Sequence, residues 1–381
     1  MLQLSLILPS FNERDNLLIL IPILQKLFHE NKISYEIIVV DDDSPDLTWK
    51  AVQDQFAKQE EIHVIRRIGK KGLSSAVIDG MAVARGTYFA VMDADMQHDE
   101  KILPQMLQEM NEHEIVIGSR LVGDGGYGDW GIVRKLMSKG ATLVAKLFLP
   151  IQVKDPMSGY FVIRRELFNE IGDKINPIGF KILLEFLGRK KGIRSKEVGY
   201  VFRTRIHGAT KMSGSVIQNY LAALYDIRFG KYVSLTFISY AIVGFLGYSI
   251  NLFSRYLFSF FFRDSSKLFT FAFTSISTSA TLAFVFSIMN NYFLNNYWTF
   301  RRVKNTGFYQ NLRGLTIFVV ISLIGLFIQL SVWNYSILLY KQSQIGSENL
   351  FINIVCNFIG IVFATATNFY LNKNITWNLK D

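Results

Sequence analysis

The sequence predicts two domains of different class: an α/β domain with a mostly parallel sheet, followed by an all-α membrane domain. Composition changes near residue 230, where a mixture of charged and apolar residues gives way to Phe, Ile, Leu, Tyr, Ser and Asn with few charges. In the first part, strand-like and helix-like segments alternate, as they do when helices cover both faces of a parallel sheet. In the second part, four apolar stretches are each long enough to cross a bilayer.

Short apolar runs mark the expected strands of the first domain, and amphipathic runs mark its helices. Strands are expected at Leu4–Leu8, Glu36–Val40, His63–Arg66, Tyr88–Met92 and Ile115–Ile117, and helices at Glu13–His29 and Leu73–Ala84. Ligands of open parallel sheets bind at the carboxyl ends of the strands. Three polar motifs stand at such ends: Pro9-Ser-Phe-Asn-Glu13, Asp41-Asp-Asp-Ser44 and Asp93-Ala-Asp95. Their common position favours a ligand site over a set of unrelated helix caps.

Asp93, Asp95 and Gln97 stand at alternate positions after an apolar strand. Side chains alternate between faces on an extended segment, so we expect these three oxygen-bearing groups to converge on one point. Oxygen ligands suit a hard cation such as Mg²⁺ or Mn²⁺, which commonly joins a few carboxylates to substrate phosphates. The alternative is an acidic loop that caps the next helix.

The apolar stretches of the second domain predict a four-helix, multi-pass membrane protein. The expected spans are Val233–Phe253, Leu268–Met289, Leu315–Leu338 and Leu350–Tyr370. The loop between the second and third spans carries four basic residues, more than either of the other two loops. By the positive-inside rule, the central loop, both termini and the α/β domain are expected on the cytoplasmic side. No cleavable signal peptide is recognised at the N-terminus, which agrees with a cytosolic α/β domain.

An internal repeat supports this topology. Residues 291–300 resemble residues 368–377 at about seven positions, so the membrane domain reads as two duplicated helical hairpins. None of the four spans carries an acidic residue, which argues against an ion-coupled transporter and favours a plain anchor.

The net charge of +10 would suit nucleic acid or an anionic membrane surface, and the membrane spans favour the surface. The one cysteine, Cys356, excludes an intrachain disulfide.

Two segments are expected to lie in the lipid headgroup layer, namely Gly131–Leu149 and a helix with apolar residues at helical spacing from Val216 to Ile227. The alternative for both segments is packing on the core of their own domain.

Seven motifs taken together resemble family 2 glycosyltransferases with the GT-A fold, and more narrowly the dolichyl- or polyprenyl-phosphate mannosyltransferases. They are LPSFNERDN, IVVDDDSPD, KGLSSAV, VMDADMQH, GSR, DPMSGY and RIHGATK, in this order. The second half resembles the GtrA-type four-helix domain. The resemblance implies a Rossmann-like GT-A domain over residues 1–212, an interfacial helix over 213–230 and a GtrA-like domain over 231–381.

The resemblance also implies the donor site. A nucleotide sugar, GDP-mannose, would be held by a group of residues that includes a loop over its diphosphate, and by Mg²⁺ or Mn²⁺ on Asp95 and Gln97 with Asp93 close by. The implied donor residues are Pro9, Phe11, Glu13, Val40, Asp42, Asp93, Ala94, Asp95, Arg205 and Lys211. Asp41 and Asp43 are expected to be helix caps or structural hydrogen-bond acceptors.

The implied acceptor is dolichyl or polyprenyl phosphate, clamped by Arg120 and Arg134. Asp155 is a candidate for a base or a sugar-hydroxyl partner, and its alternative is an Asx turn before Pro156. The resemblance implies transfer of mannose with inversion, to a β-linked product, at the cytoplasmic membrane face. Competing hypotheses are a UDP-sugar-dependent glucosyltransferase and lipid-linked sugar flipping by the membrane domain. Oligomerisation through the membrane domain is also open.

Overall fold

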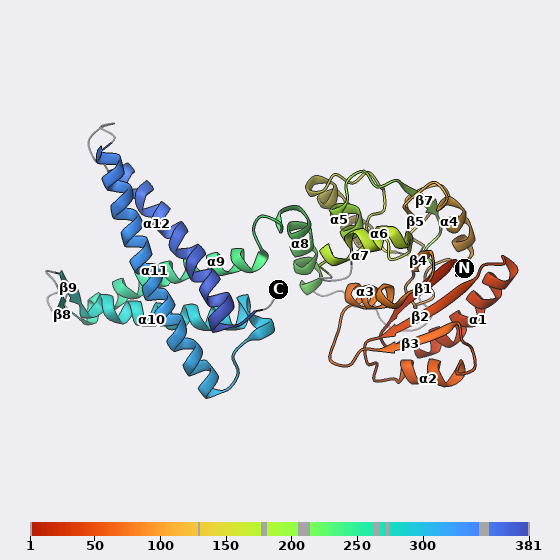
Figure 1. Ribbon diagram of the computed structural model, residues 1–381, viewed down its shortest axis with the longest axis horizontal. Coiled ribbons are helices and arrows are strands. Elements are labelled where there is room, and N and C mark those ends of the chain that lie inside the picture. The colour runs from red at the N-terminus through yellow and green to blue at the C-terminus, as the bar shows by residue number, and fades with distance from the viewer. Residues whose placement is uncertain are drawn as a thin grey trace. The chain divides into compact units, whose positions relative to one another are not determined.

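The computed structural model describes residues 2–128, 130–176, 181–204, 214–262, 267–271, 274–342 and 350–379. The chain forms two compact units, Met1–Tyr232 and Val233–Asp381 (Figure 1). The boundary between them lies close to the change in composition near residue 230.

A seven-stranded sheet is the centre of the first unit, with strand order β3-β2-β1-β4-β6-β5-β7. Every neighbouring pair is parallel except the two made by β6, which is antiparallel to β4 and to β5. The strands are β1 (Leu4–Ser10), β2 (Tyr35–Asp41), β3 (Ile62–Arg66), β4 (Tyr88–Val91), β5 (Ile115–Ser119), β6 (Phe161–Arg164) and β7 (Ser195–Gly199). The predicted, mostly parallel sheet is confirmed, and β6 and β7 are additions that the sequence analysis missed.

Helices cover both faces of this sheet, as predicted. The apolar residues of α1 (Arg14–Glu30), α2 (Thr48–Gln55) and α4 (Leu103–Glu109) pack in one buried cluster. Those of α3 (Leu73–Val83), α6 (Arg165–Ile171) and α7 (Ile182–Arg189) pack in a second cluster on the opposite face. Along α1, Leu17, Leu20, Leu24 and Phe28 recur at three- and four-residue spacing and are buried, because that spacing keeps them on one helix face. Short 3₁₀ turns, η1 (Glu100–Ile102) and η2 (Gly172–Lys174), complete the domain.

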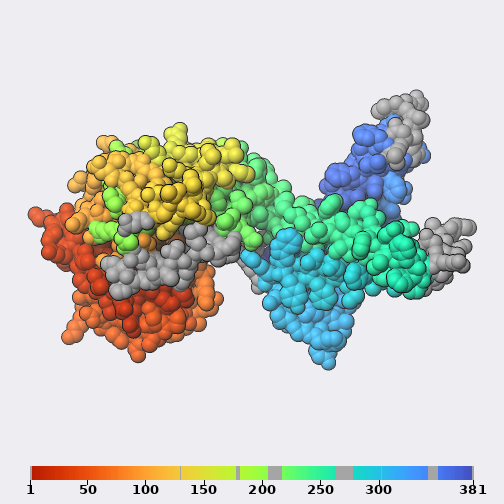
Figure 2. Space-filling view, turned by 180° about the vertical axis from the view of Figure 1, so that it is seen from behind, coloured from red at the N-terminus to blue at the C-terminus, as the bar shows by residue number. Residues whose placement is uncertain are grey.

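The two segments predicted to be interfacial form helices α5 (Ile132–Phe148) and α8 (Gly214–Phe229). They are joined by a hydrogen bond of 2.5 Å from the Tyr220 hydroxyl to the Ala141 carbonyl. Helix α5 lies on the surface of the first unit (Figure 2, yellow). Most of its large apolar side chains are exposed, among them Leu147 at 81%. Helix α8 divides its apolar residues between the core, where Leu224 is 1% exposed, and the surface. Helix α5 therefore keeps the exposed apolar and basic character of an interfacial helix.

Four helices form most of the second unit. They are α9 (Leu235–Phe261), α10 (Thr278–Leu294), α11 (Phe308–Gln342) and α12 (Leu350–Leu371). Among the described residues, three helices are long and apolar enough to cross a membrane: α9, α11 and α12. The predicted span Leu268–Met289 differs from the structure, because its first part forms the hairpin of β8 (Lys267–Phe271) and β9 (Thr274–Ser277). Strand β9 has the sequence TSIS, whose β-branched and hydroxyl residues disfavour a helix interior.

The sequence repeat has a counterpart in the structure. Helices α10 and α12 each end in a π-helical turn, Asn295–Thr299 and Asn372–Thr376, which are matching positions of the repeat. The residues that follow, Phe300 and Trp377, also match, and their rings stack with centroids 4.2 Å apart. The two hairpins therefore meet through equivalent residues.

Candidate active site

The polar motifs lie together because strands β1, β2 and β4 are parallel and adjacent. Ser10 at the end of β1 is in register with Asp41 at the end of β2. Asp41 accepts hydrogen bonds from the Ser44 amide at 2.8 Å, the Ser44 hydroxyl at 2.6 Å and the Ser10 hydroxyl at 3.1 Å. Asp43 accepts a bond of 2.7 Å from Arg66 Nε. Asp41 and Asp43 are thus the structural acceptors that the sequence analysis expected.

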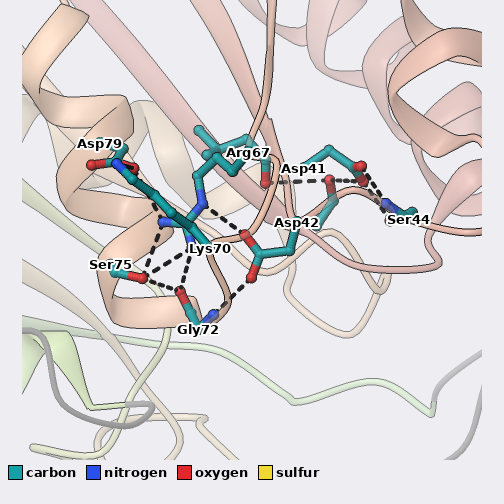
Figure 3. A network of polar contacts seen from close by, with 10 residues as sticks. Asp41, Asp42, Ser44, Arg67, Lys70, Gly72, Ser75 and Asp79 are labelled. Atoms are coloured by element: carbon teal, nitrogen blue, oxygen red, sulfur yellow. Dashed lines mark hydrogen bonds and ion pairs between the residues drawn. The ribbon is translucent and has the colours of Figure 1, made fainter. Parts of the chain in front are cut away.

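Asp42 is held by a network that the sequence analysis did not anticipate (Figure 3). Its Oδ1 accepts from Arg67 Nε and its Oδ2 from the Gly72 amide, both at 2.7 Å. The Arg67 side chain is buried, and it also donates to the Ser75 hydroxyl and to Asp79. Because carboxylates have about four acceptor positions, Asp42 keeps capacity for a ligand hydroxyl or ring N–H. The network fixes its position at the end of β2 and joins it to the glycine loop before α3.

The other expected donor residues surround this edge. Pro9 and Val40 are paired in register on β1 and β2, and the Val40 side chain packs in the core, so only its backbone faces outward. Phe11 is partly buried, and Lys71 Nζ lies 5.9 Å from the centroid of its ring. Glu13 precedes α1 and accepts a bond of 2.6 Å from Asn16 Nδ2. These residues are near the edge, but no contact among them is specific to a nucleotide.

The acidic motif after β4 is arranged by a turn, and the extended geometry assumed in the sequence analysis is wrong. Strand β4 ends at Val91, and Met96 has a left-handed φ of 63°. Ala94 is buried in the core at 2% exposure. Asp95 Oδ1 accepts from the Gln97 amide at 3.1 Å, and Gln97 Nε2 donates to the Arg203 carbonyl at 3.0 Å.

This geometry fits a divalent cation. Because Gln97 Nε2 donates to the Arg203 carbonyl, the amide oxygen of Gln97 points away from this bond and can serve as a metal ligand. Asp95 supplies a carboxylate two residues earlier. Within the described ranges, no group of three or more His, Cys, Asp and Glu side chains could hold a metal. One carboxylate and one amide oxygen would leave the remaining positions of an ion to substrate oxygens and water, as is common for Mg²⁺.

Asp93 contacts His98 and Gly159, two residues that the sequence analysis did not assign to the site. Its Oδ2 lies 3.4 Å from His98 Nε2, and His98 Nδ1 lies 2.6 Å from the Tyr200 hydroxyl. Gly159 packs against the same carboxylate, since a Cβ built at Gly159 would lie 2.8 Å from Asp93 Oδ2. The only sequence signal for His98 was its place in the motif VMDADMQH, and Tyr200 carried none.

Arg120 and Asp155 form a buried, bidentate ion pair. Arg120 Nε donates to Asp155 Oδ2 at 2.8 Å and Nη2 donates to Oδ1 at 2.7 Å, while the Arg120 amide also donates to Oδ2. The side chains are 8% and 1% exposed. Burial opposes the charge on Arg120, but the Asp155 carboxylate outweighs it and raises the pKa of Arg120. Both Asp155 oxygens are therefore engaged in orienting Arg120.

Arg134 of α5 and Arg120 both place their guanidinium groups near the ring of Trp130. The Arg134 guanidinium lies 3.7 Å from the Trp130 ring centroid and that of Arg120 lies 5.1 Å from it. Two buried donors in this group, the Trp130 indole N–H and the Tyr127 hydroxyl, have no hydrogen-bond partner among the described residues. The structure thus brings together the two arginines that the sequence analysis assigned to a phosphate clamp.

A third cation, Lys181, belongs to the same group and was missed. It immediately precedes α7, and its Nζ donates to the Met157 carbonyl at 3.1 Å. Burial of the amine, and after it the charge of Arg120, lower the pKa of Lys181 to about 8. The available signal was one lysine directly before the apolar run ILLEFL. Arg205 and Lys211, expected to cover the diphosphate, lie outside the described residues.

Comparison with known families agrees with this arrangement. Residues 5–172 match the pattern of glycosyl transferase family 2. Residues 239–377 match the transmembrane domain of the GtrA/DPMS type. The fold and the site therefore define a family 2 glycosyltransferase that carries a membrane domain.

Similar proteins with known names narrow the assignment of the family. The dolichol-phosphate mannosyltransferase of Pyrococcus furiosus is 35% identical over 99% of this chain and 99% of its own length. That of Saccharomyces cerevisiae is 32% identical over 63% of this chain and 93% of its own length. A solved glucosyl-3-phosphoglycerate synthase from Mycobacterium tuberculosis is 16% identical with a TM-score of 0.46, covering 59% of this chain and 80% of that one. The chain belongs to the dolichol-phosphate mannosyltransferase family.

Proposed function

We propose that this glycosyltransferase moves mannose from GDP-mannose to dolichyl or polyprenyl phosphate. The observation that carries the proposal is that the guanidinium groups of Arg120 and Arg134 gather at one indole ring, that of Trp130. Arginine forks match phosphate oxygens, so the pair suits a monophosphate acceptor. The names of the full-length relatives support the same substrates.

The acceptor needs no general base. A phosphate monoester is ionised near neutral pH, with a second pKa of about 6, so its oxygen is already a nucleophile. Asp155 is occupied by Arg120, which supports a positioning role for this carboxylate and leaves catalysis to alignment and charge stabilisation. One direct displacement by the phosphate oxygen would invert the anomeric carbon and give a β-linked product.

The donor side would be held by residues at the ends of β1, β2 and β4. Asp42, fixed by Arg67 and Gly72, would accept hydrogen bonds from the nucleoside, and Phe11 would stack on the base. Pro9, Glu13, Val40, Asp93 and Ala94 would complete the donor pocket, with Arg205 and Lys211 over the diphosphate. Asp95 and Gln97, with Asp93 close by, would hold Mg²⁺ or Mn²⁺. When bound, the ion would offset the charge that develops on the diphosphate.

The acceptor would reach the site from the membrane. Helix α5 carries Arg134 together with an exposed apolar and basic surface, so docking of α5 in the headgroup layer would bring the arginine cluster to lipid-borne phosphate.

We place the catalytic domain at residues 1–212, the juxtamembrane helix at 213–230 and the membrane domain at 231–381, with catalysis on the cytoplasmic face. The membrane domain would serve as the anchor.

A donor panel tests the proposal. Purified full-length protein is incubated with a polyprenyl phosphate, Mg²⁺ or Mn²⁺, and either GDP-mannose or UDP-glucose, and the lipid product is measured. We expect mannose transfer from GDP-mannose, abolished by chelation of the metal and by Asp95→Ala. Transfer from UDP-glucose alone would replace this function with the glucosyltransferase hypothesis. Full activity of Asp95→Ala at ordinary metal concentration would remove Asp95 from the ligand set.

A further inference from the structure

The Lys181 side chain is held on the turn that orients Arg120, and the charges of Arg120 and Arg134 act on it. The electrostatic environment of its amine is set by Arg120, Arg134, Asp93 and Asp155. Among the described residues, no carboxylate forms an ion pair with Lys181, and its one hydrogen bond goes to the Met157 carbonyl. Asp155, one of the two carboxylates whose charge acts on the amine, is engaged on both oxygens by Arg120.

An ammonium in a partly buried position and next to two guanidinium groups is unfavourable unless an anion joins it. Lysine has three N–H donors, and Met157 uses one of them, so two remain for another acceptor. The position of the amine is restricted, because Met157 belongs to the turn whose Asp155 orients Arg120, and Ser158 of that turn donates to the Gly118 carbonyl at 2.6 Å. Lys181 and Arg120 are thus fixed to the same turn.

The charge of the cluster also indicates what would bind. Asp155 neutralises one cation through its contacts with Arg120. Lys181 adds a positive charge to the cluster, and added positive charge favours a fully ionised phosphate monoester over a less charged ligand. Asp93 faces the cluster from the donor side, where the metal and the nucleoside diphosphate bring charges of their own.

We propose that Lys181 binds the phosphate of the acceptor directly, as the third cation beside Arg120 and Arg134. This assignment rests on the proposed function, because it takes the acceptor to be a lipid monophosphate. Lys181 then favours the dianion over the monoanion and over an uncharged lipid alcohol.

Two substitutions separate charge from structure. Lys181→Gln keeps an N–H donor for the Met157 carbonyl but removes the charge, whereas Lys181→Met removes both. Lys191→Met is the matched control, because Lys191 is exposed just beyond the other end of α7. Full-length protein in detergent is titrated with citronellyl phosphate in the absence of donor, by calorimetry, and acceptor and donor KM values are then measured.

We expect both Lys181 variants to bind citronellyl phosphate about 10- to 100-fold more weakly, as for the loss of one hydrogen bond to a charged group. The acceptor KM should rise in parallel, the donor KM should stay within about twofold, and Lys191→Met should match the wild type. If Lys181→Gln binds the phosphate as the wild type does, or if only the donor KM rises, Lys181 does not contact the acceptor. Should Lys181→Met fail to fold, Lys181→Gln alone decides the matter.

The design separates this inference from the proposed function. If the wild type transfers no mannose but both variants lose phosphate binding, the anion site stands and the proposed donor or reaction is wrong. If the wild type transfers mannose and the variants bind the phosphate normally, the inference is wrong and the function stands.

Discussion

Substitution of Asp155 by Asn tests whether this carboxylate orients Arg120 or acts as a base. Asp155→Asn keeps the shape of the side chain but removes the charge that faces a guanidinium only 8% exposed. Removing one partner of a buried ion pair costs about 3–5 kcal/mol. Asn retains one acceptor oxygen for the contacts at 2.7–3.1 Å, so we expect a loss near the lower end, about 3 kcal/mol.

The assay is urea unfolding of the full-length protein in detergent, followed by tryptophan fluorescence. Asp43→Asn is the matched control, because Asp43 also accepts a hydrogen bond from an arginine Nε, at 2.7 Å, but both partners are more than a third exposed. An exposed pair contributes only about 0–1 kcal/mol, so the control should change the unfolding free energy by no more than that. An equal, small effect of the two substitutions would refute the structural role of the Arg120 pair.

Kinetics of the combined variant complete this test. If Asp155 acts through Arg120, the losses in acceptor kcat/KM for Arg120→Gln and Asp155→Asn should not add, and the double variant should resemble the worse single one. Losses that multiply would show that Asp155 has an independent role, such as that of a base.

Three further perturbations address the rest of the domain. Gly159→Ala introduces a methyl group against Asp93 Oδ2, so we expect kcat to fall at least about tenfold while the unfolding midpoint shifts little, measured by transfer kinetics and urea unfolding. Arg67→Met removes the principal partner of Asp42, and the donor KM should rise about 10- to 100-fold with little change in the acceptor KM. Burial raises the pKa of Glu185 to about 6 from 4.5, so the folded state retains this proton and stability should decline as pH rises from about 4.5 to 6. Glu185→Gln should flatten that decline by about 2 kcal/mol in a series of urea titrations.

Controls for these variants come from neighbouring residues. Arg66→Met, beside Arg67 but paired with the exposed Asp43, should leave the donor KM unchanged. A donor KM that rises equally for both arginine variants would contradict a specific role of Arg67. For Gly159, a loss of stability as large as the loss of activity would point to misfolding. For Glu185, a difference from wild type that stays constant between pH 4.5 and 6 would contradict the raised pKa.

The membrane domain shows the limit of hydropathy patterns. Helices α9, α11 and α12 are long and apolar enough to cross a membrane, and both properties can be read directly from the sequence. The hairpin β8–β9 occupies the start of the second apolar stretch, where a helix was predicted. The prediction failed there because hydropathy measures burial preference and does not distinguish a strand from a helix.

The sequence by itself determined the alternation of strands and helices, three of the four long apolar helices and the gathering of polar motifs at one edge of the sheet. These features follow from local periodicity and from the rule that parallel strands end on the same side. Only the tertiary structure decided that Asp155 belongs to Arg120, that Arg67 holds Asp42 and that Lys181 joins the arginine cluster. The partners in these groups are separated by between 25 and 61 residues along the chain, so their contacts depend on how the sheet and helices pack rather than on any local pattern.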